Sequence, residues 1–193
     1  MNALRQWLDT LPRLAGLGRE PAEMRAGPGF RGILDATLAD IPEIVRFEMP
    51  IFQHHEEQYP YDFQISMDER QVTEKYEKIV RSPDSGAAMY VADASAVGYV
   101  SWTVYDQVKD RQAVVLSIAV EPGYRGQGLG RALLAYARER AEASGAESLR
   151  AHVWAHNVPS RAFFEAQGFT PVHTVYNAPV AAPGPPEQRD ASS

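Results

Sequence analysis

The feature that most constrains this chain is a glycine-rich stretch, Arg-Gly-Gln-Gly-Leu-Gly, at residues 125–130. An apolar, β-branched run at residues 114–120 comes directly before it, and an amphipathic helical pattern from 129 to about 143 comes directly after it. Glycines let the backbone come close to a ligand, and free N–H groups at a helix N-terminus favour an anion. The sequence therefore predicts a strand, a turn and a helix that together hold a phosphate group.

Two common phosphate-binding motifs do not fit this stretch. A Walker A loop requires Gly-Lys-Ser/Thr at its end, and no Lys follows these glycines. A Rossmann fingerprint requires Gly-x-Gly-x-x-Gly, but its last position is Arg131 when counted from Gly126 and Leu133 when counted from Gly128. A purely structural interpretation is also open, in which the glycines serve only a tight turn and close packing of the helix on the strand.

What does fit is Arg-x-x-Gly-x-Gly preceded by Ile-Ala-Val-Glu-Pro at residues 118–122, which resembles the signature of the GNAT superfamily of acyl-CoA-dependent N-acetyltransferases. A second stretch resembles the family's Asn…Tyr-x-x-x-Gly-Phe block: Asn157 begins a helical pattern that ends in Gln-Gly-Phe at 167–169, with Phe164 where Tyr is expected. The Ile-Ala-Val-x-Pro block also resembles the branch that acetylates the N-terminal alanine of ribosomal proteins.

Periodicity and capping patterns predict strands and helices in the order β-α-α-β-β-β-α-β-α-β. The capping-box patterns Asp40-x-x-Glu43 and Ser66-x-x-Glu69 are each expected to begin a helix. The expected strands are residues 31–36, 89–92, 97–104, the run ending at 120, 149–153 and 172–176. This order matches the GNAT fold. The resemblance implies a mixed α/β domain with a mostly antiparallel, twisted central sheet flanked by helices, and an acyl-CoA site at a splay between two central strands.

Three regions are expected along the chain. Residues 1–29 form a helical N-terminal extension, interrupted by Pro12 and closed by Gly-Pro-Gly at 27–29. Residues 30–177 form the N-acetyltransferase domain, and residues 178–193 form a disordered Pro/Ala-rich tail. The sequence leaves open whether the extension covers part of the core, mediates self-association into a homodimer, or is a poorly anchored arm.

Composition excludes several function classes. The formal charge of −6 argues against a general nucleic-acid binder, which would show a basic face. The absence of Cys excludes thiolate metal sites and a Cys acyl-enzyme, so direct transfer is the simpler mechanism. No apolar run approaches the roughly 20 residues of a membrane helix, and Asp9, Arg13 and Arg19 interrupt the apolar residues that a signal peptide would need. A cytoplasmic protein without a membrane partner is expected.

The resemblance implies which residues hold acetyl-CoA. Backbone groups of Ile118, Ala119 and Val120 would pair with the pantetheine arm, and an N–H there would polarise the acyl carbonyl. Arg125 would add positive charge beside the pyrophosphate, and Asn157 would contact the pantetheine amides, although a helix cap is an equal alternative for Asn157. The backbone amides that would hold the pyrophosphate belong to Gly126, Gln127, Gly128, Leu129, Gly130 and Arg131.

Aminolysis of a thioester also needs a neutral amine and a stabilised leaving group. His152 is the expected base, because the ribosomal branch carries a catalytic Glu at the matching place and a His has a suitable pKa range. A partly buried His bonded to a neighbour is the alternative. In much of the family the position of Phe164 carries a Tyr that protonates the leaving thiolate. Here Ser117, another hydroxyl or a water could do so, or the activity could be weakened or lost.

The functional hypothesis is an N-acetyltransferase that moves an acetyl group directly from acetyl-CoA to a primary amine. The alternative is a noncatalytic acyl-CoA-binding module, for which Phe164 is the main support. The family binds its acceptor partly through the segment that corresponds here to residues 54–63. Its His-His-Glu-Glu stretch at 54–57 has metal-ligand residue types, but adjacent residues rarely face one ion. A solvated or substrate-lining loop is expected there, and no metal site.

Overall fold

The computed structural model describes residues 20–58, 67–107 and 110–175. In chain order the helices and strands are α2 (Ala22–Ala26), β1 (Arg31–Asp35), the 3-10 helix η1 (Leu38–Asp40), α3 (Ile41–Gln58), α4 (Glu69–Arg81), β2 (Ser85–Ala92), β3 (Ser95–Asp106), β4 (Arg111–Val120), the 3-10 helix η2 (Pro122–Tyr124), α5 (Leu129–Ala143), β5 (Ser148–Ala151) and α6 (Val158–Ala166). From β1 to α6 the strands and α-helices follow one another in the predicted order.

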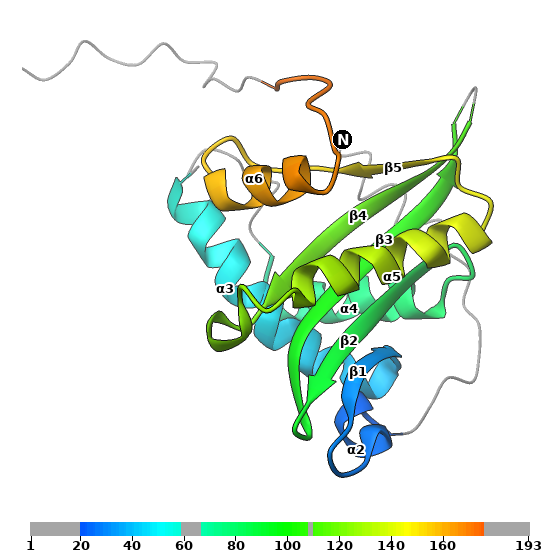
Figure 1. The fold of residues 1–193 in the computed structure, drawn as a ribbon, viewed down its shortest axis with the longest axis vertical. Coiled ribbons are helices and arrows are strands. Elements are labelled where there is room, and N and C mark those ends of the chain that lie inside the picture. Colours follow the sequence, from blue (N-terminus) through cyan, green and yellow to red (C-terminus); the bar gives the residue numbers. More distant parts are fainter. Residues whose placement is uncertain (1–19, 59–66, 108–109, 176–193) are drawn as a thin grey trace, which may run out of the picture.

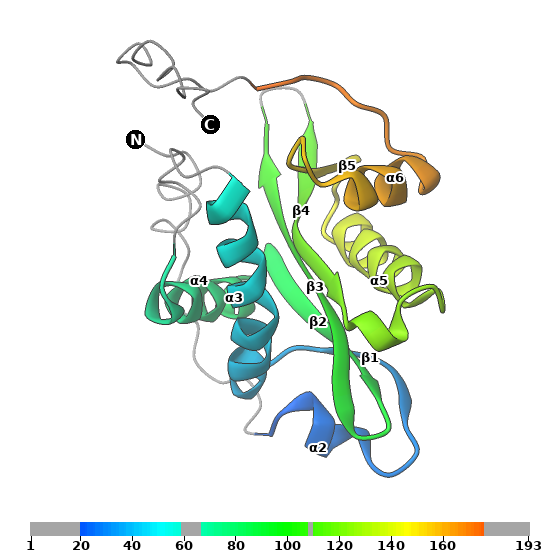
Figure 2. The same cartoon turned by 90° about the vertical axis from the view of Figure 1, so that its left-hand side faces the viewer.

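The sheet has five strands in the order β1-β2-β3-β4-β5. The first four strands pair antiparallel, whereas β5 runs parallel to β4 (Figure 1). Helices α3 and α4 cover one face of the sheet, and α5 and α6 cover the other (Figure 2). This architecture confirms the expected mixed α/β fold with a mostly antiparallel sheet flanked by helices.

Apolar burial on both faces holds these layers together. On the α3 and α4 side, Ile44, Tyr76 and Ile79 are fully buried against strand residues such as Met89. On the α5 side, the buried face includes Leu133 and packs against Val100 and Trp102, among others. Each fully buried large side chain contributes about 1.5–3 kcal/mol relative to an exposed one, so both helix layers are fixed firmly to the sheet.

The predicted capping box at Asp40 and Glu43 is wrong. Asp40 instead closes a box with Thr37 upstream, because its Oδ2 accepts from Thr37 N at 2.7 Å and from Thr37 Oγ1 at 2.9 Å. Asp40 is 1% exposed and also accepts a hydrogen bond from Ala22 N. A carboxylate that already binds these donors is not available to cap α3.

The start of α4 is also shifted from the predicted one. Asp68 caps the helix: its Oδ1 accepts from Gln71 N at 2.7 Å, and Gln71 Oε1 accepts from Asp68 N at 3.0 Å. Glu69 is the first residue of α4 and therefore cannot be the third-position partner of Ser66, which itself lies outside the described residues. The chain offers two overlapping box patterns here, and the second one forms.

Residues 20–26 of the predicted extension are attached to the domain through α2. Ala22 is fully buried in the apolar cluster beneath α3. Arg25 forms an ion pair with Asp40 at 3.0 Å, and Glu23 accepts from Ala96 N at 2.7 Å. Residues 1–19, with their apolar residues at helical spacing, and residues 176–193 lie outside the described residues, so the division into three regions stays a prediction.

Two predicted strands are corrected at the C-terminal end. The strand expected to reach residue 153 ends at Ala151. The strand expected at 172–176 is not formed by residues 172–175, where Val172 and Val175 are 70% and 78% exposed. An apolar alternation needs a partner strand to become part of a sheet, and the described part of the chain supplies none here. None of the described helices has the length and apolarity that crossing a membrane requires.

Candidate active site

The central strand β4 loses its neighbour halfway along its length. Residues 112–115 of β4 pair with residues 148–151 of β5, whereas β4 itself continues to Val120 (Figure 1). Within the described residues no strand pairs with this side of residues 116–120. We call this stretch, residues 116–120, the open half of β4. The expected splay between two central strands lies at this position.

The alternation of hydrogen bonds between β3 and β4 shows which backbone groups of β4 face away from β3. Glu121 N donates to Val97 O at 2.9 Å, so the N–H of Glu121 points toward β3. Because bonding directions alternate along an antiparallel strand, the backbone groups of Ile118 and Val120 point the other way, into the splay. Arg125 Nε donates to Val120 O at 3.0 Å, which agrees with that direction. Two of the three residues expected to pair with a pantetheine arm therefore present backbone groups to the splay. The third, Ala119, turns its backbone groups toward β3 instead.

A β-bulge sits at the start of the open half of β4. Ser101 of β3 pairs with Ser117, but the next residue, Trp102, pairs with Val115, so Leu116 has no partner. A bulge bends its strand and re-aims the neighbouring side chains. Leu116 packs against the apolar cluster under α3 and α4, and Ser117 contacts Tyr99 of β3.

The glycine turn beyond β4 is open at two of its three glycines. Gly126 and Gly128 have φ values of +75° and +85°, and a Cβ built on either would meet no heavy atom within 4 Å. Gly128 is the N-cap residue of α5 and provides no side-chain cap. The first N–H groups of α5 therefore face open space, which suits an anion.

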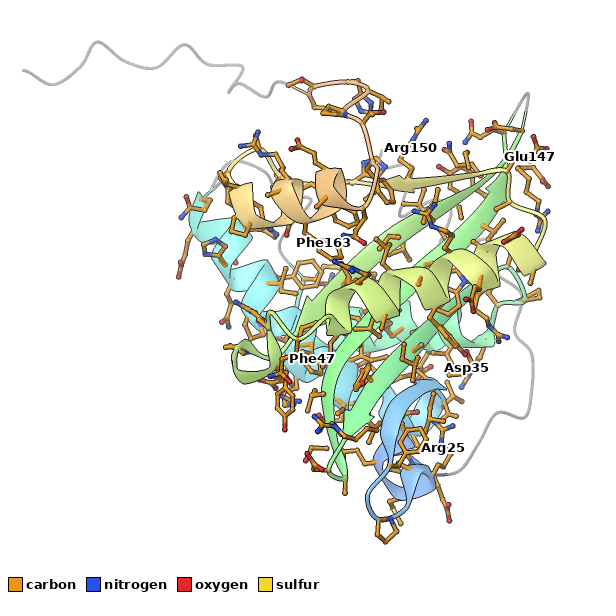
Figure 3. The ribbon with its side chains drawn as sticks, in the orientation of Figure 1. Arg25, Asp35, Phe47, Glu147, Arg150 and Phe163 are labelled. Carbon is orange, nitrogen blue, oxygen red and sulfur yellow. The ribbon has the colours of Figure 1, made fainter. Side chains whose placement is uncertain are left out.

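Gly130 has a different environment. A Cβ at this position would lie 3.3 Å from Cε2 of Phe163, whose side chain points from α6 toward α5 in Figure 3. This glycine allows close packing of α5 on α6, and not only of the helix on the strand. Leu129 is also a core residue, with 7% of its surface exposed. For both residues only the backbone remains as a candidate ligand group.

The polar residues of the turn are held locally. Gln127 Nε2 donates to Gly123 O at 3.1 Å. On the outer side of α5, Arg131 and Arg138 line a cavity of about 260 Å³ together with Gln167. Arg131 lies in the first turn of α5, where its guanidinium group adds to the positive potential of the helix N-terminus, whereas Arg138 lies in the third turn.

Asn157 and Phe164 each take a structural role in the described chain. Asn157 Oδ1 accepts from Ser160 N at 3.1 Å, so its side chain caps α6. Phe164 is 7% exposed and packs edge to face against Phe163 and Phe169, with ring centroids 5.2 and 5.1 Å apart. The cap leaves the amide NH₂ group of Asn157 to bind a ligand, whereas Phe164 contributes only an apolar ring.

His152 lies just past the end of β5. Residues 149, 151 and 153 pack into the cluster beneath α5 and α6, whereas Arg150 and His152 are not part of it and the side chain of His152 is exposed. Figure 3 shows Arg150 pointing away from α5. Desolvation lowers the pKa of His152 below its ordinary value, and the positive charge of Arg150 and the neighbouring His173 lower it further. The ring is therefore neutral at neutral pH and can accept a proton.

The segment expected to be a loop at residues 54–57 is instead the C-terminal end of α3. It meets the turn that follows β5: His55 Nδ1 lies 3.1 Å from His156 Nε2, and the rings of His54 and His156 are 5.5 Å apart. Trp154 joins this group, 5.5 Å from the ring of His55. Burial, with the positive potential of His156 and His54, lowers the pKa of His55 to about 4. We call these four side chains the histidine cluster.

Spacing does not predict the histidine cluster, because its members lie about 100 residues apart in the sequence. The rest of the segment implicated in acceptor binding, residues 59–63, lies outside the described residues. Across residues 20–58, 67–107 and 110–175, no group of three or more His, Cys, Asp or Glu side chains is placed to bind a metal.

A buried polar network, also not predicted, lies under α3 and α4. Glu48 of α3, 2% exposed, accepts a hydrogen bond from Tyr99 and pairs with Lys75 of α4 at 3.4 Å. Tyr99 Oη lies 2.6 Å from Ser117 Oγ, so the network reaches the open half of β4. Tyr76 Oη joins it, 3.4 Å from Tyr99 Oη. A lone charge in a helical pattern is normally read as exposed, which is why the sequence does not reveal the network.

Comparison with known proteins shows similar chains among acetyltransferases. Mycothiol acetyltransferase of Beutenbergia cavernae is 41% identical over 64 residues, which cover 32% of this chain and 22% of that protein. Ribosomal protein bS18-alanine N-acetyltransferase of Escherichia coli (strain K12) is 41% identical over 63 residues, which cover 33% of this chain and 43% of that protein. The matches thus span less than half the length of these two relatives.

Solved structures share the fold. The BH1408 protein from Bacillus halodurans superposes with a TM-score of 0.66 at 15% identity, covering 77% of this chain and 99% of that one. Aminoglycoside N-acetyltransferase AAC(6')-Iy in complex with CoA superposes with a TM-score of 0.62 at 15% identity, covering 79% and 96%. The family model described as acetyltransferase (GNAT) family matches residues 49–169, more than half of the chain. The chain belongs to the acetyltransferase (GNAT) family.

Proposed function

We propose that this protein is an N-acetyltransferase that transfers an acetyl group directly from acetyl-CoA to a primary amine. The observation that carries the proposal is the open half of β4, whose outward-facing backbone groups lead straight into the open glycine turn. A pantetheine arm is a chain of amides that can pair with such a strand, and its pyrophosphate would then reach the N-terminus of α5. Membership of the family supports the same donor.

The proposed donor site uses backbone more than side chains. Backbone groups of Ile118 and Val120 hold the pantetheine arm, and an N–H of one of them polarises the acyl carbonyl, whereas the backbone of Ala119 faces β3. The open positions at Gly126 and Gly128 receive the pyrophosphate, with Arg125 adding charge. When bound, acetyl-CoA supplies the activated acyl carbon. The backbone amides of Gln127, Leu129, Gly130 and Arg131 complete the proposed cradle.

The acceptor amine is proposed to arrive from the opposite side of the sheet. The glycine turn leads into α5, whereas Ser117 faces the layer of α3 and α4 and the exposed His152 lies outside the cluster beneath α5. We assign His152 as the group that takes the proton from the amine, since its pKa is lowered and the ring is neutral at neutral pH. The histidine cluster at the end of α3 lies on the same side and would line the approach.

A second candidate function is a noncatalytic acyl-CoA-binding module. It is favoured by Phe164, whose buried ring carries no proton for a leaving thiolate. The variant Phe164→Tyr separates the two readings. In an enzyme limited by protonation of sulfur it should turn over faster than wild type. Slow turnover on every amine, in wild type and variant alike, would favour the binding module.

The proposed function is tested by following CoA release from acetyl-CoA with a panel of amines. The panel contains an Ala-initiated peptide, sisomicin and phosphinothricin, because these represent the acceptors named for similar proteins. Acetylation of at least one amine, identified by mass spectrometry, is the expected result. Hydrolysis of acetyl-CoA without any acetylated amine would contradict the proposal.

A further inference from the structure

Ser117 stands at the junction of the splay and the buried polar network. It is the first residue of β4 after the bulge, it is partly exposed, and its side chain faces the layer of α3 and α4. The next residue, Ile118, presents its backbone to the splay. A group that binds Ser117 Oγ from the open side would therefore lie next to the place proposed for the acyl carbon.

The network fixes the direction of the Ser117 hydroxyl. Glu48 carboxylate oxygens only accept hydrogen bonds, and Tyr99 has one proton to give. Tyr99 Oη is within hydrogen-bonding distance of both Glu48 Oε1 and Ser117 Oγ, yet it cannot donate to both. The carboxylate is the stronger acceptor, so the phenol proton goes to Glu48. The contact of 2.6 Å between Tyr99 Oη and Ser117 Oγ must then be bridged by the proton of Ser117, which leaves the lone pairs of Ser117 to accept a hydrogen bond.

Two further features keep the hydrogen bonds of the network in this direction. Lys75 Nζ lies 3.4 Å from Glu48 Oε2, where it balances the charge of the buried carboxylate. Burial and the nearby Glu48 raise the pKa of Tyr99 well above its ordinary value, so the phenol keeps its proton. Both Tyr99 and Glu48 are almost completely buried, and water does not compete for their hydrogen bonds.

We propose that Ser117 Oγ accepts a hydrogen bond from the acceptor amine and thereby selects primary over secondary amines, with Tyr99 and Glu48 as positioning residues. This inference rests on the proposed function and names the substrate class of the same site. It also gives Ser117 a role different from that of an acid for the thiolate, because its only proton points inward.

The selectivity follows from the proton balance of aminolysis. The nitrogen lone pair forms the new C–N bond, the C–S bond breaks, and its electron pair leaves with sulfur. A neutral primary amine has two N–H protons: one goes to the base, His152, and the other stays in the amide, bound to Ser117. A secondary amine must give its single proton to the base. Ser117 Oγ then has no hydrogen-bond donor in a site that is partly shielded from water, and binding of the secondary amine is weakened.

The test compares matched pairs of acceptors. Steady-state turnover of acetyl-CoA is measured with benzylamine, alanine amide and an Ala-initiated peptide, each beside its N-methyl derivative. Wild type should favour the primary amine by about tenfold or more in kcat/KM. Ser117→Ala should raise KM for primary amines about tenfold, leave the N-methyl amines and the KM for acetyl-CoA nearly unchanged, and so remove the preference. Ser117→Thr, which keeps the hydroxyl, should restore it.

Variants within the network separate positioning from folding. Tyr99→Phe removes the inward acceptor of the Ser117 proton, so it should reduce the preference in the same direction. Ser101→Ala is the matched control: Ser101 is fully buried and bonded to Tyr76 at 3.2 Å, but it does not reach the splay. It should keep the wild-type preference. CoA affinity by calorimetry reports whether each variant is folded, and Ser117→Cys replaces Ser117→Ala if the latter does not bind CoA.

The outcomes distinguish the inference from its premise. If wild type acetylates none of the primary amines, the proposed function itself fails. If primary amines are acetylated but Ser117→Ala keeps the wild-type preference, only the role of Ser117 is overturned. If Ser117→Ala loses the preference while Tyr99→Phe keeps it, Ser117 binds the amine without help from Tyr99 and Glu48, and the positioning role is overturned.

Discussion

Three alternating glycines lie around the start of α5, but they do not share one role. Gly126 and Gly128 adopt positive φ and border open space, whereas Gly130 is required by the ring of Phe163. Any substitution at Gly130 therefore tests helix packing as much as ligand binding. Gly128 is the position where ligand binding can be tested alone.

Gly128→Glu should abolish CoA binding in a folded protein. The new side chain would enter the open space at the start of α5 and bring a negative charge beside the proposed pyrophosphate, while φ of +85° adds some strain. Calorimetry with CoA measures the loss, and a thermal melt checks folding. Gly123→Glu is the control, because its Cβ also meets open space but lies in η2, before the turn. Unchanged CoA affinity in Gly128→Glu would remove the turn from the donor site.

His152→Ala should lower the acyl-transfer rate by ~10²–10⁴ with little change in CoA affinity. The wild-type rate should rise with pH through an inflection below the ordinary His value of about 6.5, because the pKa of His152 is lowered and only the neutral ring accepts a proton. The inflection should be absent from the residual activity of the variant. Full activity in His152→Ala would return this residue to the role of a partly buried His without a catalytic task.

Single residues also mark the limit of sequence-based prediction. The glycine turn could be predicted because the residues that form it are consecutive in the sequence. Glu48 and Tyr99 could not, because a charge on α3 and a phenol on β3 become one network only when the helix covers that strand. The box at Asp40 was misassigned for a similar reason: its strongest partners, Thr37 and Ala22, precede the helix rather than follow its start.

At the scale of elements, α5 was predictable to the residue. Its N-terminus follows from the glycine turn, and its C-terminus from Gly145, whose φ of +79° allows the chain to leave the helix. Ala146 N donates to Ala141 O at 3.0 Å and Gly145 N donates to Glu142 O at 2.8 Å, which together complete a Schellman motif. Strand β5 was predicted too long, because the alternation at 149–153 continues after the pairing with β4 has ended.

The attachment of α2 gives a prediction at this scale. Asp40→Ala should destabilise the protein by about 2–4 kcal/mol, since it leaves buried donors of Ala22 and Thr37 unpaired and removes the partner of Arg25. Urea denaturation measures the loss. Glu43→Ala is the control from the same predicted box, and its half-exposed pair with Arg46 should cost at most about 1 kcal/mol. Equal losses in the two variants would mean that α2 is not anchored by Asp40.

At the scale of the whole molecule, the histidine cluster connects two distant parts of the chain. His55 belongs to α3 on one face of the sheet, and His156 belongs to the turn between β5 and α6 (Figure 1). This is a direct side-chain bond between the α3 layer and the segment that closes the far side of the splay. Its strength therefore affects the relative position of the two halves proposed to bind donor and acceptor.

Acid should weaken this connection. The folded protein holds the pKa of His55 at about 4, below the ordinary value of about 6.5, so the unfolded chain takes up the proton first as pH falls. The stabilising contribution is complete above about pH 6.5 and is lost as pH falls toward 4. His55→Phe, which keeps an aromatic ring, should show a smaller fall in urea midpoint between pH 7 and pH 5 than wild type. An equal fall in both proteins would assign the acid sensitivity to other groups.

The open half of β4 has one more consequence. Along residues 116–120 the chain is apolar apart from Ser117, and it carries no charge or proline of the kind that protects strand edges elsewhere. Within the described residues, the fold thus keeps along β4 an edge suited to pairing with a strand of another molecule. A pantetheine arm bound as proposed would occupy those backbone groups. The donor would then protect the protein against aggregation as well as serve its chemistry, and a cell depleted of CoA would lose soluble protein along with activity.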